Sequence, residues 1–187
     1  MNTSKALREH LSDSRGHIPR WFTVRNPRLM GGEHPCPGGT SQEQRARLRM
    51  LCAIGVTTFV DLVDYRMENG VEPYRRLLPH TGRNGIPISH HHFPVPDAGI
   101  PRSRGYVEEI LDVIDISLLN AERVYMHCRS GVGRTGTLLA LHLVRHGRSP
   151  ESALEQVGAA WTKDPRSAQW PTCPQTTDQR HFVMRSV

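Results

Sequence analysis

Apolar residues alternate along the chain between short continuous runs and longer stretches with helical spacing. Three runs of β-branched and apolar residues are typical of strands that are covered on both faces. These runs are GVTTFVDLVD at 55–64, ISHHHFPV at 88–95 and VYMHC at 124–128. A further pair of short strands is predicted within 21–32, where Asn26-Pro27 can form the turn.

Helical patterns separate these strands, which predicts an α/β fold with a central, mostly parallel sheet of four or five strands flanked by helices. A capping box of Ser41 and Gln44 marks the start of the first helix, and Ser149-Pro150 marks the start of a later one. The other helices are predicted within 72–78, 105–120, 131–147 and 174–183. Residues 1–20 are polar and are expected to form an arm ahead of one domain over 21–187.

The composition excludes several classes of protein. A length of 187 residues fits one domain of ordinary size. No run approaches the roughly 20 apolar residues of a membrane span, and the N-terminal stretch lacks the apolar segment of a secretory signal. The four cysteines, Cys36, Cys52, Cys128 and Cys173, show no CxxC spacing. This spacing disfavours a zinc site or a disulfide framework, and we expect a reducing, cytoplasmic setting.

The charge of the chain favours an anionic partner. The formal net charge is +6, and all but two of the 24 basic residues, Lys5 and Lys163, are arginines. A guanidinium group binds phosphate and carboxylate through paired hydrogen bonds. A codon preference for arginine explains the same excess equally well. The arginines are scattered along the chain, which weakens a nucleic-acid interpretation.

The segment HCRSGVGRTG at 127–136 has the chemistry of an anion-binding loop. Its glycines allow a tight turn in which successive N–H groups point inward, and the helix that follows directs its positive end to the same place. Arg134 can bind two oxygens of an oxyanion. A Cys128 thiol in that field is expected to ionise readily, and a thiolate beside a bound phosphate is a nucleophile. A small core cysteine remains the ordinary alternative for a residue at a strand end.

The same segment resembles the signature HCx5R[ST] of the cysteine-dependent protein-tyrosine phosphatase superfamily, and the resemblance extends from about residue 28 to residue 184. It implies a compact dual-specificity or tyrosine phosphatase of bacterial type. Cys128 is then the nucleophile, Arg134 binds the phosphoryl oxygens, His127 braces the loop and Thr135 hydrogen-bonds the sulfur. The main-chain N–H groups of six residues are implied to bind the phosphate: Arg129, Ser130, Gly131, Val132, Gly133 and Arg134.

A phosphatase of this kind also needs an acid for the leaving oxygen, because an aryl oxide with a pKa near 10 leaves poorly without a proton. The resemblance assigns this role to Asp97 in the segment PVPDAGIP, which lies upstream of Cys128. Val95 stands where tyrosine-specific members have tryptophan, which argues against a loop closure hinged on that tryptophan. A solvated turn residue is the ordinary alternative for an aspartate in such a loop.

The segment PQTTDQRHFV at 174–183 resembles the QTxxQ element that positions the hydrolytic water in tyrosine-specific members. Gln175, Thr176 and Gln179 match it, and we assign the catalytic role to Gln175 with Gln179 as the other candidate. The structural alternative is a helix start with Thr176 or Thr177 as N-cap.

Other polar residues are given structural roles. His90, His91 and His92 lie on a predicted strand, where consecutive side chains point to opposite faces and cannot all bind one metal ion. We take Asp61, Asp64 and Glu68 as surface or capping groups. Cys36, Cys52 and Cys173 are candidates for a thiol that resolves oxidised Cys128, although a core or loop position is the simpler interpretation.

The sequence therefore predicts a phosphatase that needs no cofactor and no metal ion and acts on phosphorylated proteins, with phosphotyrosine as the best substrate. Phosphoserine and phosphothreonine are further candidates. Alternatives are a phosphoinositide phosphatase, an RNA 5′-phosphatase, and a phosphate-binding pseudophosphatase without turnover. Nucleic acid is not favoured as a partner, and no oligomeric state is predicted.

Overall fold

The computed structural model describes residues 20–24, 26–82 and 85–186. Of the expected N-terminal arm, residues 1–19 lie outside the described residues. None of the helices in the described part of the chain combines the length and the apolar character needed to cross a bilayer.

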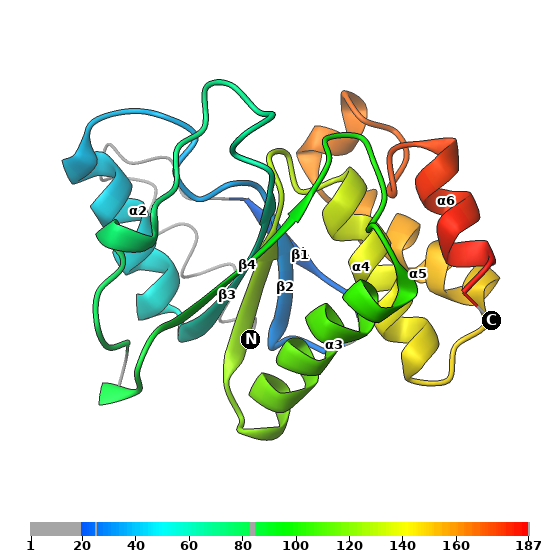
Figure 1. Cartoon of the computed structure of the whole chain (residues 1–187), viewed down its shortest axis with the longest axis horizontal. Helices are drawn as coiled ribbons and strands as arrows, with labels where there is room; N and C mark the ends of the chain where they lie inside the picture. Colours follow the sequence, from blue (N-terminus) through cyan, green and yellow to red (C-terminus); the bar gives the residue numbers. More distant parts are fainter. Residues whose placement is uncertain (1–19, 25, 83–84, 187) are drawn as a thin grey trace.

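A five-stranded sheet with the order β1-β2-β5-β3-β4 forms the centre of the molecule (Figure 1). Its strands are β1 (Trp21–Thr23), β2 (Leu29–Gly32), β3 (Val56–Val63), β4 (Ser89–Val95) and β5 (Arg123–His127). Strands β2, β5, β3 and β4 are parallel to one another, and only β1 pairs antiparallel with its neighbour β2. The mostly parallel sheet and the antiparallel strand pair around Asn26-Pro27 confirm the predicted α/β class.

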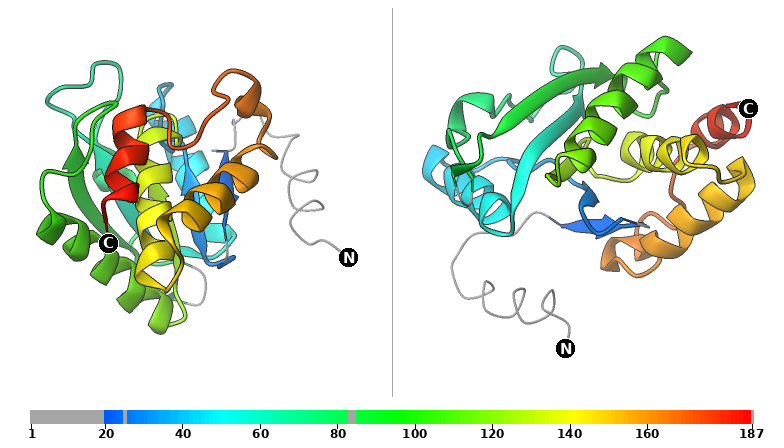
Figure 2. Two further views of the ribbon diagram at one scale, coloured as in Figure 1. Left: turned by 90° about the vertical axis from the view of Figure 1, so that its right-hand side faces the viewer. Right: turned by 90° about the horizontal axis from the view of Figure 1, so that it is seen from below.

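Helices cover both faces of this sheet (Figures 1 and 2). Helix α2 (Ser41–Ala53) and the short 3-10 turn η1 (Arg75–Leu77) lie on one face. The opposite face carries the larger helical layer: α3 (Arg104–Leu119), α4 (Gly133–Arg145), α5 (Pro150–Trp161), the 3-10 turn η3 (Pro165–Ala168) and α6 (Thr177–Met184). Helix α4 is buried along most of its length because α3, α5, α6 and the sheet surround it.

Alternating side chains of the central strands divide the core into two clusters. Phe59 on β3 and Tyr125 on β5 point toward α2, whereas Val60 and Met126, one position further along each strand, point toward the larger helical layer. Every residue of β3 is buried, as expected for a strand covered on both faces.

Two details of the predicted helices were wrong. The capping box of α2 uses Thr40 and Glu43, one residue before the predicted pair, because the Thr40 hydroxyl accepts from the Glu43 amide. The predicted helix within 72–78 is only the 3-10 turn η1. Helix α6 begins at Thr177, inside the predicted segment, and Thr176 is its N-cap, one of the two residues expected there. The start of α5 at Ser149-Pro150 is confirmed.

Candidate active site

The carboxyl ends of β3, β4 and β5 meet at one edge of the sheet, and each is followed by residues with reactive or charged side chains. Cys128 follows β5, Asp97 follows β4, and the acidic segment that contains Glu68 follows β3. Open α/β sheets bind ligands at this edge. The parallel topology therefore brings together residues that are far apart in the sequence.

The loop between β5 and α4, residues 128–132, is the expected catalytic loop and folds around the Cys128 sulfur. The thiol is buried, and Gly131 donates its main-chain N–H to Cys128 Sγ over 3.3 Å. Gly131 has a φ of 78°, and a Cβ atom there would overlap the main chain of Gly32 on β2. Only glycine meets both requirements at this position without strain. The tight turn predicted from the glycines is therefore present.

Arg134, in the first turn of α4, points into the same site and is 2% exposed. Its guanidinium forms a two-pronged ion pair with Glu68, in which Nη2 lies 3.0 Å from Oε2, and it also contacts Asp97 Oδ1 at 2.8 Å. Nη1 donates to the main-chain oxygen of Val95 at 3.0 Å. Burial alone would lower the pKa of Arg134, but Glu68, Cys128 and Asp97 outweigh it and raise this pKa. The guanidinium is thus a fixed charge.

Glu68 is the main member of this site that sequence reasoning placed wrongly. The expectation of a surface group is wrong, because the residue is 5% exposed and is paired with Arg134. Its Oε1 also accepts from the Asp64 amide at 3.1 Å, as a capping group does. Asp61 is also fully buried, whereas Asp64 does cap the following turn by accepting from the Arg66 amide. The position of Glu68 soon after β3 could have predicted its place in the site, because the carboxyl ends of parallel strands lie at one edge of the sheet.

Asp97 stands at the outer side of the site, with its side chain 61% exposed. It lies in the loop between β4 and α3, and the helix α6 supports this loop from behind. Gln179 Nε2 donates to the main-chain oxygen of Gly99 at 2.9 Å. The exposed carboxylate is therefore held on a braced loop within reach of Arg134.

His127 is fully buried behind the loop and fixes its orientation. Nδ1 lies 3.2 Å from the Cys128 main-chain oxygen, and Nε2 lies 2.6 Å from the hydroxyl of Tyr74. Burial lowers the pKa of His127, against the opposing effect of Asp61, so the ring is neutral. Because a carbonyl oxygen can only accept, Nδ1 carries the hydrogen and Tyr74 donates to Nε2.

A buried polar network continues from His127 toward α2. Tyr65 donates to Asp61 Oδ2 over 2.7 Å, and His34 Nε2 lies 3.0 Å from the Tyr65 hydroxyl. His90 Nε2 lies 3.3 Å from Asp61, while His91 stacks on Phe93, so the histidine run does spread over both faces of β4. This set of hydrogen-bonded rings supports the catalytic loop from beneath.

The remaining predicted residues occupy different environments. Thr135 Oγ1 is buried and has no hydrogen-bond partner among the described residues. Gln179 is fully buried and closes the capping box of α6 with Thr176, so the structural alternative for this pair is present. Gln175 is exposed just before α6. Arg129 is exposed and donates to the Asn69 main-chain oxygen at 3.1 Å.

The three other cysteines divide between the two sides of the sheet. Cys173 belongs to the same core cluster as Cys128, and its thiol donates to the Val132 main-chain oxygen over 3.2 Å. Cys36 and Cys52 lie in the cluster under α2. Burial raises the pKa of Cys36 to about 12 and that of Cys52 to about 11, which leaves both as inert thiols.

Arg166 supports the catalytic loop from η3 and was not singled out in the sequence. Its Nη1 donates to the Ser130 main-chain oxygen at 2.8 Å, while Asp164 and Glu33 pair with the same guanidinium. The local pattern Asp164-Pro165-Arg166 gives no sign of this contact, because Ser130 lies 36 residues away.

This fold and this loop are those of the tyrosine and dual-specificity class of cysteine-dependent phosphatases. The family described as "Polymorphic toxin system, DSP-PTPase phosphatase" matches residues 36–148, which is more than half of the chain. The chain belongs to this family.

Curated relatives and solved structures agree with this assignment. "Putative tyrosine phosphatase 067L" of Invertebrate iridescent virus 3 is 30% identical over 149 residues, which are 74% of this chain and 57% of that protein. "Cyclin-dependent kinase inhibitor 3" of Sus scrofa is 31% identical over 99 residues, which are 52% of this chain and 42% of that protein. The chain thus spans only part of the length of these relatives.

Two solved structures show the same fold. Kinase associated phosphatase, with a serine in place of its catalytic-site cysteine, superposes with a TM-score of 0.65 at 20% identity and covers 89% of this chain and 93% of its own. Tk-PTP in its active form gives a TM-score of 0.60 at 22% identity and covers 88% of this chain and 93% of its own.

Proposed function

We propose that this protein hydrolyses phosphotyrosine in proteins, and also phosphoserine or phosphothreonine, through a cysteinyl-phosphate intermediate. The observation that carries the proposal is the meeting of three segments at one point: the loop around Cys128, the guanidinium of Arg134 and the carboxylate of Asp97. A nucleophile, a fixed cation and an acid are the groups that phosphomonoester hydrolysis requires.

In the first step, the Cys128 thiolate attacks phosphorus and the bond to the leaving oxygen breaks. Asp97, protonated at that moment, gives its proton to this oxygen, so that tyrosine leaves as a neutral phenol. The main-chain N–H groups of 129–134 and the Arg134 guanidinium stabilise the charge on the phosphoryl oxygens. Thr135 supplies a hydroxyl that can donate to the sulfur, because its Oγ1 has no other partner among the described residues.

The contacts of Arg134 indicate how a phosphate group enters the site. Nη1 donates to Glu68 and to the Val95 main-chain oxygen, and Nη2 donates to Glu68 through one hydrogen. The second hydrogen of Nη2 is donated to Asp97. Nε makes no hydrogen bond to any described residue. A phosphate that binds through Nε and Nη2 therefore displaces Asp97 from the arginine, while Glu68 keeps the guanidinium in place. The released carboxyl group is then free to serve the leaving oxygen.

In the second step, water attacks phosphorus of the cysteinyl phosphate, the bond from phosphorus to sulfur breaks, and Asp97 accepts the proton of the water. Gln175 is our candidate for orienting this water, since it is exposed and directly precedes Thr176, whose hydroxyl donates to the Ala98 main-chain oxygen in the loop of Asp97 at 3.5 Å. Gln179 instead holds that loop, because its amide is engaged with Gly99 and Thr176. The residues present supply charge stabilisation without a metal ion.

The proposal is tested with purified protein and a panel of a phosphotyrosine peptide, a phosphoserine peptide and phosphoinositide vesicles, with wild type and Cys128→Ser. We expect the highest kcat/KM on phosphotyrosine, and turnover below detection in Cys128→Ser. The variant should still bind the phosphopeptide, because the main-chain N–H groups and Arg134 remain. Turnover by the serine variant would contradict the role of Cys128, and binding without turnover by the wild type would indicate a pseudophosphatase.

A phosphoinositide substrate is the second candidate, and Arg129 is the observation that favours it. This exposed guanidinium lies within the catalytic loop and adds positive charge at the mouth of the site. Among proteins with this fold, the solved structure of PTPMT1 is a complex with PI(5)P. If the wild type prefers the phosphoinositide vesicles in the panel and Arg129→Ala loses this preference, a phosphoinositide and not phosphotyrosine is the substrate.

A further inference from the structure

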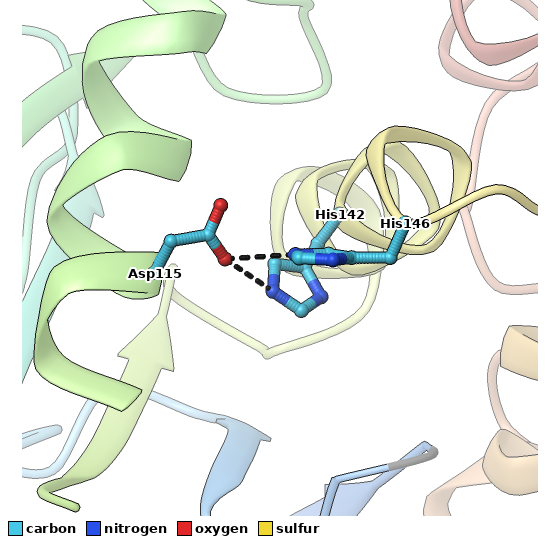
Figure 3. Close-up of side chains that lie close together, drawn as sticks. All are labelled: Asp115, His142 and His146. Atoms are coloured by element: carbon cyan, nitrogen blue, oxygen red, sulfur yellow. Dashed lines mark hydrogen bonds and ion pairs between the residues drawn. The ribbon is translucent and has the colours of Figure 1, made fainter. Parts of the chain in front are cut away.

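A second cluster of polar side chains lies at the far end of α4 from the catalytic loop. His142 lies in the last turn of α4, His146 is the C-cap residue four positions further on, and Asp115 reaches both from α3 (Figure 3). Asp115 Oδ1 lies 3.0 Å from His142 Nε2 and 2.9 Å from His146 Nε2. Figure 3 shows both rings turned toward this single oxygen atom. One carboxylate oxygen is thus shared by two imidazole groups.

We propose that Asp115, His142 and His146 form a binding site for a zinc-type divalent cation. Two histidines at i and i+4 on one helix, completed by a carboxylate, are a common zinc-ligand set. The three donor atoms all lie within 4.8 Å of one another. Ligand atoms of a tetrahedral zinc ion, at about 2.1 Å each, are separated by about 3.4 Å, so a small displacement of Asp115 makes room for the ion.

The present hydrogen bonds already point both donor atoms at one place. Each Nε2 lies within hydrogen-bond distance of Asp115 Oδ1, so on binding each would exchange this hydrogen bond for a bond to the metal, with the ring hydrogen on Nδ1.

The charge around the cluster is also favourable, although arginines are present. Arg145 contacts the second oxygen of Asp115, Oδ2, at 3.3 Å and leaves Oδ1 for the cation. Asp112 and Glu108 on α3 pair with the same guanidinium. Three carboxylates therefore surround Arg145, and Arg28 is a second basic residue on the wall of the groove.

The geometry leaves room for a further ligand. Asp115, His142 and His146 line a groove of about 740 Å³ between α3, α4 and the turn before β2. Its other walls are largely apolar and include Leu118 and Leu143. A zinc ion with three protein ligands keeps a fourth position for water or a bound group, and here that position can open toward the groove. The site would also link α3 to α4, the helix that carries Arg134 at its other end.

The test is a calorimetric titration of the chelator-treated full chain with zinc chloride. We expect one equivalent to bind, and Asp115→Asn and His146→Ala to weaken binding by at least about tenfold. His146 is half exposed, so its truncation should be tolerated, and the thermal midpoint without metal checks that each variant is folded. His181→Ala, at an exposed position on α6, is the matched control and should bind as wild type.

Cobalt chloride separates this site from the thiols. A cation held by imidazole and carboxylate gives visible cobalt absorption without the near-ultraviolet band of a cobalt–thiolate bond. The proposal would be overturned if Asp115→Asn and His146→Ala kept the visible cobalt bands. A cobalt–thiolate band in the wild type would overturn it as well. Unchanged zinc affinity in both folded variants would overturn it as well and would leave the cluster as a set of hydrogen bonds between α3 and α4.

Discussion

At the scale of single residues, the contact between Arg134 and Asp97 joins binding to catalysis. The carboxylate sits on the guanidinium edge that a phosphate group must use, at 2.8 Å from Nη2. In the proposed mechanism, Asp97 competes with the substrate for Arg134 before it assists the leaving group. This double role makes its substitution informative in two separate measurements.

Asp97→Asn should lower kcat on a phosphotyrosine peptide by about 10²–10⁴-fold, the usual value of a positioned acid. The loss should be much smaller for an aryl phosphate whose leaving group has a pKa near neutrality. The same variant should bind inorganic phosphate more tightly, because a competing charge has been removed. Steady-state rates over aryl phosphates of graded leaving-group pKa, with phosphate as competitive inhibitor, measure both effects. Asp178→Asn, at an exposed position on α6, is the control. An equal loss on all esters would show that Asp97 is not the acid.

Glu68 holds Arg134 from the opposite side, and both side chains are 2% exposed. Glu68→Gln keeps the shape but removes the charge, and the loss of a charge-assisted hydrogen bond should lower the free energy of unfolding by about 2 kcal/mol. The value of kcat/KM should fall as well, since Arg134 is then less well positioned. Urea unfolding and steady-state kinetics measure these effects, and exposed Glu72→Gln is the matched control. Wild-type kcat/KM in a folded Glu68→Gln variant would contradict this role.

At the scale of elements, the sequence predicted what local pattern determines. The continuous apolar runs predicted β3 and β5, and the glycines of 127–136 predicted a tight loop before α4. Both predictions succeed because strand burial and turn geometry depend on residues that are close together in the sequence. The cap of α2 was misplaced by one residue, since Thr40 and Ser41 are both good N-cap residues. Contacts between distant elements were missed: Glu68 with Arg134 and Arg166 with Ser130 join residues 66 and 36 positions apart. Only the packed fold determines such contacts.

At the scale of the whole molecule, the polar network behind the catalytic loop makes stability depend on pH. Its histidines are buried as neutral rings: burial lowers the pKa of His34 to about 3 and also lowers that of His127. Asp61, in contrast, is favoured in its charged form. Burial opposes its charge, but His127 and hydrogen bonds from His90 and Tyr65 lower its pKa. The effect of Asp61 is therefore confined to pH values below about 4, the ordinary range of an aspartate.

The buried histidines affect the free energy of unfolding at higher pH values than Asp61 does. An unfolded chain protonates histidine below about pH 6.5, whereas folded His34 stays neutral down to about pH 3. Between these values the unfolded state binds more protons, so the free energy of unfolding should fall as the pH falls below about 6.5. Each such histidine contributes a slope of up to about 1.4 kcal/mol per pH unit.

His34→Gln should therefore reduce the steepness of this loss by about one histidine's share between about pH 4.5 and pH 6. This window lies above the range in which Asp61 titrates, so the change in slope reports on the buried ring alone. Urea unfolding at several pH values gives the slope for wild type and variant. His80→Gln, at an exposed position, should keep the wild-type slope. If His34→Gln lowers the stability equally at every pH in this window, His34 acts only through its hydrogen bonds and not through the proton it excludes.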